Sequence, residues 1–294
     1  MTNAFEASRA RLSGIAYRLL GGSADIDDVL QEAWLRWERA DKLTIESPAA
    51  WLTTCVTRLA LDRLRKRKRD QVHYLGPWLP TPVLSNVGNP ADAAELADSM
   101  TMAFLIMLEE LTPDERVAFL LADVFGERFD TIADILQRTS ESCRQLASRA
   151  RRKVQESQSN RRDELHASRV VVDRFLEAIL NGDERSAMQC LSEDIVSLSD
   201  GGPDRHAARR PVHGRDRVYR LLHNLWGRIP ATWNVQPAVV GGYPGLVFSD
   251  QSGIKLTTSF EVVDGLVVRT ITILNPDKLA GIDQARQLGD LLDL

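Results

Sequence analysis

The sequence predicts a multi-domain protein: two all-α domains, followed by a smaller α+β domain. Three observations predict this class. The chain has 294 residues, whereas single hydrophobic cores rarely grow past roughly 250 residues. Apolar residues recur at helical spacing through most of the first 155 residues, and alternation with a period of two appears only in the last third. Stretches rich in proline or polar residues separate these regions, and each proline removes a backbone donor.

Composition excludes several classes of protein. Apolar residues make up 44% of the chain, which is enough to bury real cores, and the net charge of −4 argues against a general nucleic-acid binder. No unbroken apolar stretch could span a bilayer, and the N-terminus has charges where a signal peptide needs apolar residues. The three isolated cysteines Cys55, Cys143 and Cys190 predict neither a disulfide framework nor a zinc site. We therefore expect a cytoplasmic protein with no membrane contact, no metal and no cofactor.

The chain divides at its composition changes. Three helices are expected in the first domain, and the last domain opens with helices at 166–181 and 184–191. Alternation from Ile254 to Val262, the turn signal Asp264-Gly265 and the β-branched run that follows predict antiparallel strands. The expected segments are a helical domain at 1–69, a Pro/Gly-rich linker at 70–92, a second helical domain at 93–155, a polar linker at 156–164, the α+β domain at 165–280 and a tail at 281–294.

A basic cluster near residue 150 predicts a DNA-reading helix. The segment 129–136 reads as a short helix, Gln137-Arg138 as a tight turn, and Thr139 or Ser140 as the cap of a second helix. Cys143, Leu146 or Ala147, Ala150 and Val154 would face inward, leaving Arg144, Gln145, Ser148, Arg149 and Arg152 outside. Arginine and glutamine can read base edges in a major groove, and serine can contact phosphate. The alternative is a solvated basic face of an ordinary bundle.

A second basic cluster lies on the helix expected at about 48–69. Its apolar side includes Leu52, Val56 and Leu64, and its outward positions are expected to be Thr57, Arg58, Leu61, Asp62 and Arg65. The helix ends in the run RKRKR, which could follow a phosphate backbone. The alternative is a basic helix end that complements the helix dipole, but the run is too dense for that role alone. No Lys or Arg occurs between Arg69 and Arg116, so the two clusters predict two separate contacts with one polyanion.

An acidic face precedes both clusters. In the stretch ADIDDVLQEAWLRW, Asp25, Asp28 and Glu32 recur at spacings of three and four, with Gln31 beside them. Such a face suits docking on a basic protein partner, and the alternative is a solvated helix surface.

Together these stretches resemble a bacterial sigma factor of the extracytoplasmic-function class. DDVLQEAWLRW resembles the family's polymerase-binding segment, AWLTTCVTRLALDRLRKRKR its −10 promoter-reading helix, and the segment from Leu111 to Val154 its −35-reading helix-turn-helix. The remainder resembles the subset with a C-terminal SnoaL-like domain, through WLPTP at 78–82, CRQLASRARRKV at 143–154 and NPDKL at 275–279. The chain departs from that subset at Thr81, where the subset has Glu, and at Pro203-Asp204 in its DGGGK-like turn.

The resemblance implies partners and site residues. Asp28, Gln31 and Glu32 would contact the beta-prime clamp of core RNA polymerase. The loop 41–50 would hold a flipped base of the −10 element, with Thr57, Arg58, Asp62 and Arg65 near the single strand. The outward residues of the second basic helix, Arg144, Gln145, Ser148, Arg149 and Arg152, would read the −35 promoter DNA. Regulatory contacts would come from Trp78, Leu79, Pro80, Asp200, Gly201, Gly202, Asn275, Pro276, Asp277 and Lys278.

The resemblance also implies that the C-terminal domain is a cone formed by a curved sheet and helices. Asp200, His206, His213 and Tyr243 could act as acid or base there, but they show no catalytic spacing, so we expect a regulator rather than an enzyme. A small-molecule ligand of this domain is a further expectation. The amphipathic tail 281–294 could dock on the helical domains or be a frayed terminus. Two alternatives stay open: a one-component regulator with a ligand-sensing cone, and an isomerase or cyclase fused to a DNA-binding module.

Overall fold

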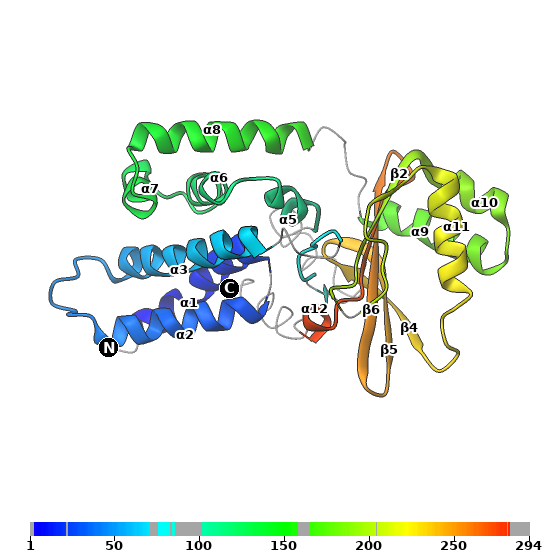
Figure 1. Ribbon diagram of the computed structural model, residues 1–294, viewed down its shortest axis with the longest axis horizontal. Helices are drawn as coiled ribbons and strands as arrows, with labels where there is room; N and C mark the ends of the chain where they lie inside the picture. Colours follow the sequence, from blue (N-terminus) through cyan, green and yellow to red (C-terminus); the bar gives the residue numbers. More distant parts are fainter. Residues whose placement is uncertain are drawn as a thin grey trace. The chain divides into compact units, whose positions relative to one another are not determined.

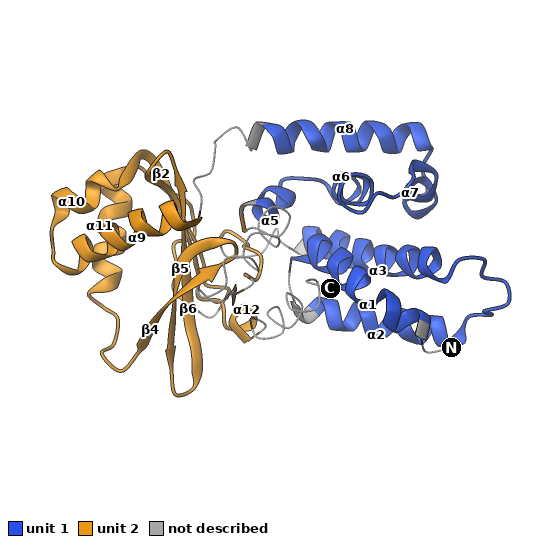
Figure 2. Cartoon of the chain, turned by 180° about the vertical axis from the view of Figure 1, so that it is seen from behind, with its two compact units in different colours: residues 1–72, 103–159, 284–294 blue, residues 73–102, 160–283 orange. Residues whose placement is uncertain are grey.

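The chain forms two compact units (Figures 1 and 2). The computed structural model describes residues 3–21, 23–70, 76–82, 84–85, 102–157, 165–203, 205–280 and 282. The first unit contains both helical regions, and the second contains the α+β region together with the described part of the segment 76–85. Residues 86–101, most of the predicted polar linker and all of the predicted tail except residue 282 lie outside the described residues.

Three helices begin the first unit: α1 (Asn3–Leu20), α2 (Ser23–Arg39) and α3 (Pro48–Asp70). Helix α1 ends where Gly21 adopts a positive φ of 65° and its NH donates to the Tyr17 carbonyl over 2.7 Å. Pro48 opens α3, where its fixed φ suits a first helical turn. The three helices bury Leu12, Ile26 and Leu52 completely, so their apolar faces form one core.

The helices α5 (Met102–Glu109), α6 (Pro113–Phe119), α7 (Phe129–Leu136) and α8 (Ser140–Ser157) complete this unit, with a π-helical turn, η2 (Leu120–Val124), after α6. A capping box starts α6, in which the Thr112 hydroxyl and the Glu115 carboxylate each accept from the other residue's backbone NH. Gln137 ends α7 in the left-handed region at φ 54°, and the Thr139 hydroxyl accepts from the Ser142 NH at the start of α8. The expected helix-turn-helix is confirmed.

Helix α3 is covered on more than one side. It packs against α1 and α2, and also against α6 and α7. The sequence placed Thr57 and Leu61 on its outward face, but Thr57 is fully buried and Leu61 is 2% exposed. That prediction was wrong because it assumed that α3 has one buried and one solvated side, whereas α6 and α7 pack against α3 in addition to α1 and α2. Arg58, Asp62 and Arg65 are exposed.

The second unit contains a sheet with three helices on one face (Figure 1). These helices are α9 (Leu165–Leu180), α10 (Glu184–Gln189) and α11 (Arg215–Trp226), and a further short helix, α12 (Pro276–Ala280), follows the last strand. Seven strands are hydrogen-bonded in the order β1-β4-β5-β6-β7-β2-β3. They are β1 (Leu84–Ser85), β2 (Leu191–Asp200), β3 (Val212–His213), β4 (Asn234–Val240), β5 (Tyr243–Asp250), β6 (Gly253–Val263) and β7 (Leu266–Ile273).

Apolar side chains fill the space between α9–α11 and the sheet. Phe175 of α9 lies edge-on to Phe260 of β6 at 5.8 Å between ring centroids, and Trp226 of α11 meets Phe248 of β5 at the same distance. The helix between 166 and 181 and the turn at Asp264-Gly265 are confirmed, the latter with φ of 51° and 73°. This packing forms the core that positions the strand ends.

The sheet differs from the expected antiparallel pattern in three respects. β2 runs parallel to β7. Parallel strands need a long connection, which here contains β3, α11 and β4–β6. The linker contributes edge strand β1, which pairs with β4 through Leu84 and Val240. Residues 257–263 of β6 are buried on both faces, although alternation predicted one solvated face. Alternation could not reveal that the polar face of this strand is covered too.

Candidate interfaces with nucleic acid and polymerase

Helix α8 presents a polar face opposite its buried stripe. Cys143, Ala147 and Ala150 are fully buried, with Leu146 and Val154 nearly so. The side chains predicted to read DNA are all exposed: Arg144, Gln145, Ser148, Arg149 and Arg152. The Arg144 guanidinium lies 5.3 Å from the centroid of the Phe129 ring and 3.7 Å from Glu141, so it is held near the N-terminal end of α8. A helix with exposed arginine, glutamine and serine side chains has the shape and chemistry to enter a major groove.

The exposed basic residues of α3 contact the second set of helices. Arg58 donates to the Asp134 carbonyl over 2.7 Å, and Arg65 lies 2.9 Å from the Asp114 carboxylate. Arg138, in the turn before α8, binds the same Asp114 at 2.7 Å. Burial alone would raise the pKa of Asp114, but hydrogen bonds from Arg65 and Arg138 hold it below its usual value. Two of the residues predicted to meet the −10 strand, Arg58 and Arg65, are therefore bound to partners inside this unit.

A buried ionic cluster joins the end of α3 to α5 and α6. Arg116 is 1% exposed and donates to the Leu19 carbonyl and to Glu109, each over 2.8 Å, and also to the Leu108 carbonyl. Arg67 binds the same Glu109 oxygen at 3.0 Å. Burial alone would raise the pKa of Glu109, but the charges of Arg116 and Arg67 hold it below its usual value.

Sequence reasoning missed this cluster. The available signal was Glu109, a carboxylate at the end of the apolar run MAFLIML, because an acid in such a position needs a partner when it is buried.

The predicted polymerase-binding residues lie on one surface of α2. Asp28 and Gln31 are exposed and Glu32 is half-buried, with Arg36 at 2.6 Å and Arg63 of α3 at 3.8 Å from its carboxylate. Beside them is an open groove of about 480 Å³ between α1 and α2, lined by Phe5, Glu6, Arg9, Asp27, Leu30, Gln31 and Trp34. Trp34 is 38% exposed, so the surface offers an aromatic anchor next to its acids.

In the second unit, the segment 76–82 is tied to the α+β domain by an ion pair. The Asp200 carboxylate is completely buried, accepts from the Leu79 NH over 2.8 Å and lies 2.5 Å from the Lys278 ammonium. Lys278 also donates to the Leu79 carbonyl and lies 3.9 Å from the Trp78 ring centroid. Pro80 is buried beside them. Three sequence motifs that are far apart in the chain thus converge on one backbone segment.

The two glycines after Asp200 fit because neither has a side chain. Gly202 has φ 61°, and a Cβ there would lie 2.8 Å from the Asn275 side chain. A Cβ on Gly201 would lie 2.6 Å from the Arg205 carbonyl oxygen. Pro276 and Asp277, by contrast, are exposed in the first turn of α12, where the Asn275 side chain accepts from the Asp277 NH.

The four acid–base candidates of the C-terminal domain lie in different surroundings. Both carboxylate oxygens of Asp200 are occupied, because Oδ1 accepts from Gly202 and Oδ2 from Leu79. His206 and His213 are exposed, and Tyr243 is buried at the start of β5. Across the described residues, His, Cys, Asp and Glu side chains form no cluster of three that could hold a metal ion. No helix in the described part of the chain is long and apolar enough to cross a membrane.

Comparison with known proteins decides the family. Residues 4–70 match the Sigma-70 region 2 model, and residues 101–154 match the Sigma-70 region 4 model. The ECF RNA polymerase sigma factor SigJ of Mycobacterium tuberculosis is 38% identical over 94% of this chain and 92% of its own length. The chain belongs to the ECF sigma factors. A probable ECF sigma factor of the same species, SigI, is 32% identical over 94% of this chain and 93% of its own length.

The solved structure of the M. tuberculosis sigma factor SigJ matches the whole architecture of this ECF sigma factor. The TM-score is 0.75 at 36% identity, and the match covers 96% of this chain and 99% of the other. The two helical regions are therefore sigma regions 2 (α1–α3) and 4 (α5–α8), and the α+β domain is SnoaL-like. The chain is an alternative sigma factor that directs transcription initiation, and the one-component regulator is not favoured.

Proposed function

We propose that this sigma factor binds the beta-prime clamp of core RNA polymerase through α2 in the cytoplasm. The exposed side chains of Asp28 and Gln31, the half-buried Glu32 and the neighbouring groove support this surface. Acidic side chains around an aromatic residue suit a basic, partly apolar partner, because buried aromatic anchors supply much of the energy of protein interfaces.

Promoter recognition is divided between two helices in this proposal. The exposed face of α8 binds the −35 element. This role is assigned because the polar side chains on that face are exposed. Arg58, Asp62 and Arg65 of α3, with the loop 41–50, bind the −10 strand. Thr57 is buried in the free chain, so a contact with DNA requires that its surroundings move.

In the free chain, regions 2 and 4 are held together in a closed arrangement that cannot bind both promoter elements at once. Regions 2 and 4 are in direct contact through Arg58, Arg65 and the Glu109 cluster. Elements centred 25 base pairs apart are separated by about 85 Å of duplex at 3.4 Å per base pair. Two regions in contact cannot occupy both elements, so polymerase and promoter must replace the contacts between them. DNA phosphates and bases would then take the place of Asp134 and Asp114 as partners of the two arginines.

The SnoaL-like domain regulates this opening, because it holds the segment that connects regions 2 and 4. Asp200 and Lys278 bind both backbone groups of Leu79, so the connector is fixed to this domain at that residue. The space beneath α9–α11 is filled by Phe175, Phe248 and Phe260, which favours a regulatory role over catalysis or ligand sensing. The chain itself performs no covalent chemistry in this account.

In vitro transcription with purified core polymerase tests the proposal. The wild-type chain should produce defined start sites on DNA from its own upstream region, and a variant with Arg144→Ala and Arg149→Ala should lose them. A matched control with Arg174→Ala and Arg185→Ala removes two exposed arginines from the C-terminal domain and should keep them. Absence of start sites with the wild-type chain, and of a complex with core polymerase, would contradict the proposed mechanism.

A further inference from the structure

The SnoaL-like domain has a basic surface that none of these roles uses. Residues 205–220 contain six arginines and two histidines against a single acid, Asp216, in a chain whose net charge is −4. The segment includes β3 and the first half of α11. We call it the arginine segment. A concentration of one charge sign on a chain of opposite net charge indicates a specific polyanionic partner rather than a solubilising surface.

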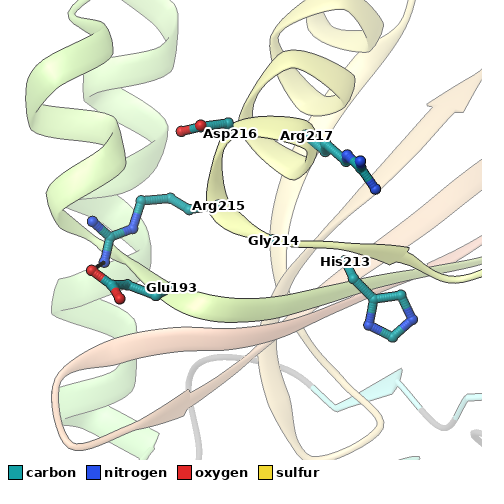
Figure 3. A pocket seen from close by; sticks show the side chains of 6 residues that line it. All are labelled: Glu193, His213, Gly214, Arg215, Asp216 and Arg217. Atoms are coloured by element: carbon teal, nitrogen blue, oxygen red, sulfur yellow. Dashed lines mark ion pairs between the residues drawn. The ribbon is translucent and has the colours of Figure 1, made fainter.

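The side chains of this segment are largely available for binding. Arg205, Arg209, Arg210 and Arg217 are exposed, and within the described residues they form no ion pair. Figure 3 shows the arrangement around the start of α11: Arg215 extends toward Glu193, at 3.8 Å, whereas His213 and Arg217 point to the other side. Within the described residues, the guanidinium groups of Arg205, Arg209, Arg210 and Arg217 are thus without acidic partners.

The chemistry of the segment favours phosphate over an acidic protein. All its strong cations are arginines, whose planar groups can bind phosphate oxygens in bidentate fashion. No large apolar side chain of the segment is exposed, so the surface lacks the anchors on which protein interfaces depend. Gly214 precedes α11 without a side-chain cap, which adds the positive end of that helix to the same surface.

The covalent connection to α8 determines which phosphates are within reach. Helix α8 ends at Ser157 and α9 begins at Leu165. These residues are eight peptide steps apart, which limits their separation to about 27 Å. That distance corresponds to about eight base pairs of duplex. When α8 reads the −35 element, the SnoaL-like domain therefore stays close to the neighbouring DNA.

We propose that the arginine segment binds the phosphate backbone of duplex DNA flanking the −35 element. This inference rests on the proposed placement of α8 in promoter DNA. It makes the SnoaL-like domain a direct, sequence-independent contributor to promoter affinity, in addition to its hold on the connector. Each phosphate that an arginine neutralises releases counterions, so the contribution must depend steeply on salt.

The test measures promoter binding by the holoenzyme between 50 and 200 mM salt. The variant Arg209→Gln/Arg210→Gln/Arg217→Gln should lower the slope of log K against log salt by about 2 to 3, which is roughly 0.9 for each lost contact. Its affinity near physiological salt should fall by about tenfold or more. The Lys triple variant at the same positions should keep most of the slope.

The control variant Arg174→Gln/Arg185→Gln/Arg228→Gln removes three exposed arginines from elsewhere on the domain and should leave the slope unchanged. Equal slopes for the wild-type chain and the first variant would overturn the inference. Weaker binding to core polymerase without DNA, at an unchanged DNA slope, would overturn it in favour of an acidic protein partner. Failure of the wild-type holoenzyme to initiate anywhere would instead contradict the proposed promoter mechanism, so the two failures are distinguishable.

Discussion

The hold of the SnoaL-like domain on the connector should depend on Lys278. The substitution Lys278→Met keeps much of the side-chain volume but removes the ammonium that lies 2.5 Å from the completely buried Asp200 carboxylate, which also accepts from the NH groups of Leu79 and Gly202. Removing one partner of a buried ion pair costs about 3–5 kcal/mol. At 1.4 kcal/mol per tenfold change, the local opening that frees Leu79 should become about 100- to 4,000-fold more populated.

Hydrogen exchange at the Leu79 amide reports this opening directly, because that NH donates to Asp200. We expect its exchange to accelerate in Lys278→Met, and the double variant with Asp200→Asn to recover part of the protection, since the uncompensated charge is gone. Lys255→Met is the control: it breaks a more exposed pair with Asp250, worth about 0–1 kcal/mol. Unchanged Leu79 exchange in Lys278→Met would refute the reasoning.

Three further predictions concern other parts of the chain. Gly202→Ala should destabilise the second unit in urea unfolding by more than Gly182→Ala, because both glycines have positive φ but only at Gly202 would a Cβ meet another side chain, that of Asn275; equal losses would contradict the packing argument. Burial alone would raise the pKa of Glu109, but its arginine partners hold that pKa below the usual 4.5. The Glu109 cluster therefore stabilises the fold fully above about pH 4.5, and this stabilisation is lost as the pH falls through the lower pKa of the folded state. Limited proteolysis should show loosening of regions 2 and 4 on acidification, and a Glu109→Gln variant with the same acid response would argue against this origin. Trp34→Ala should weaken binding to core polymerase by at least about 30-fold if this residue is an interface anchor, measured by titration of labelled chain, and unchanged affinity would remove the groove from the interface.

Much of the helical architecture could be predicted because local signals and tertiary packing agree. In α8, the buried stripe of Cys143, Ala150 and Val154 has the spacing that the sequence predicts. The turn before α8 is marked by a residue that tolerates the left-handed region and by a hydroxyl that caps. Such features depend on neighbours within a few residues, which the sequence places directly.

The features that sequence reasoning missed depend on contacts between distant segments. Thr57 is polar and lies among the expected outward positions of α3, yet it is fully buried in a helix that packs against region 4 as well as against α1 and α2. β1 has only two residues, and its pairing with β4 joins positions more than 150 residues apart. The Glu109 cluster likewise brings together residues from three helices. No local pattern specifies such partners, because burial of a polar group becomes visible only when the whole fold is known.

The SnoaL-like motifs could be predicted in part: the residues could be named from the sequence, but their contacts could not. Resemblance marked Asp200, Leu79 and Lys278 as regulatory, but gave no geometry. The structure supplies an ion pair and two backbone hydrogen bonds that make the three residues one unit. The sites on polymerase and DNA stay predictions that the experiments above address.

Regions 2 and 4 are in contact in the free chain, and assembly with polymerase on promoter DNA should separate them. Spin labels at Leu43→Cys, which is 97% exposed in the loop after α2, and at the exposed Gln155→Cys of α8 would measure this separation. The native cysteines are all buried, which favours selective labelling. We predict one defined distance in the free chain and an increase of several tens of ångströms in the holoenzyme on promoter DNA, toward the scale of about 85 Å between the two elements. The same distance in both states would contradict the claim.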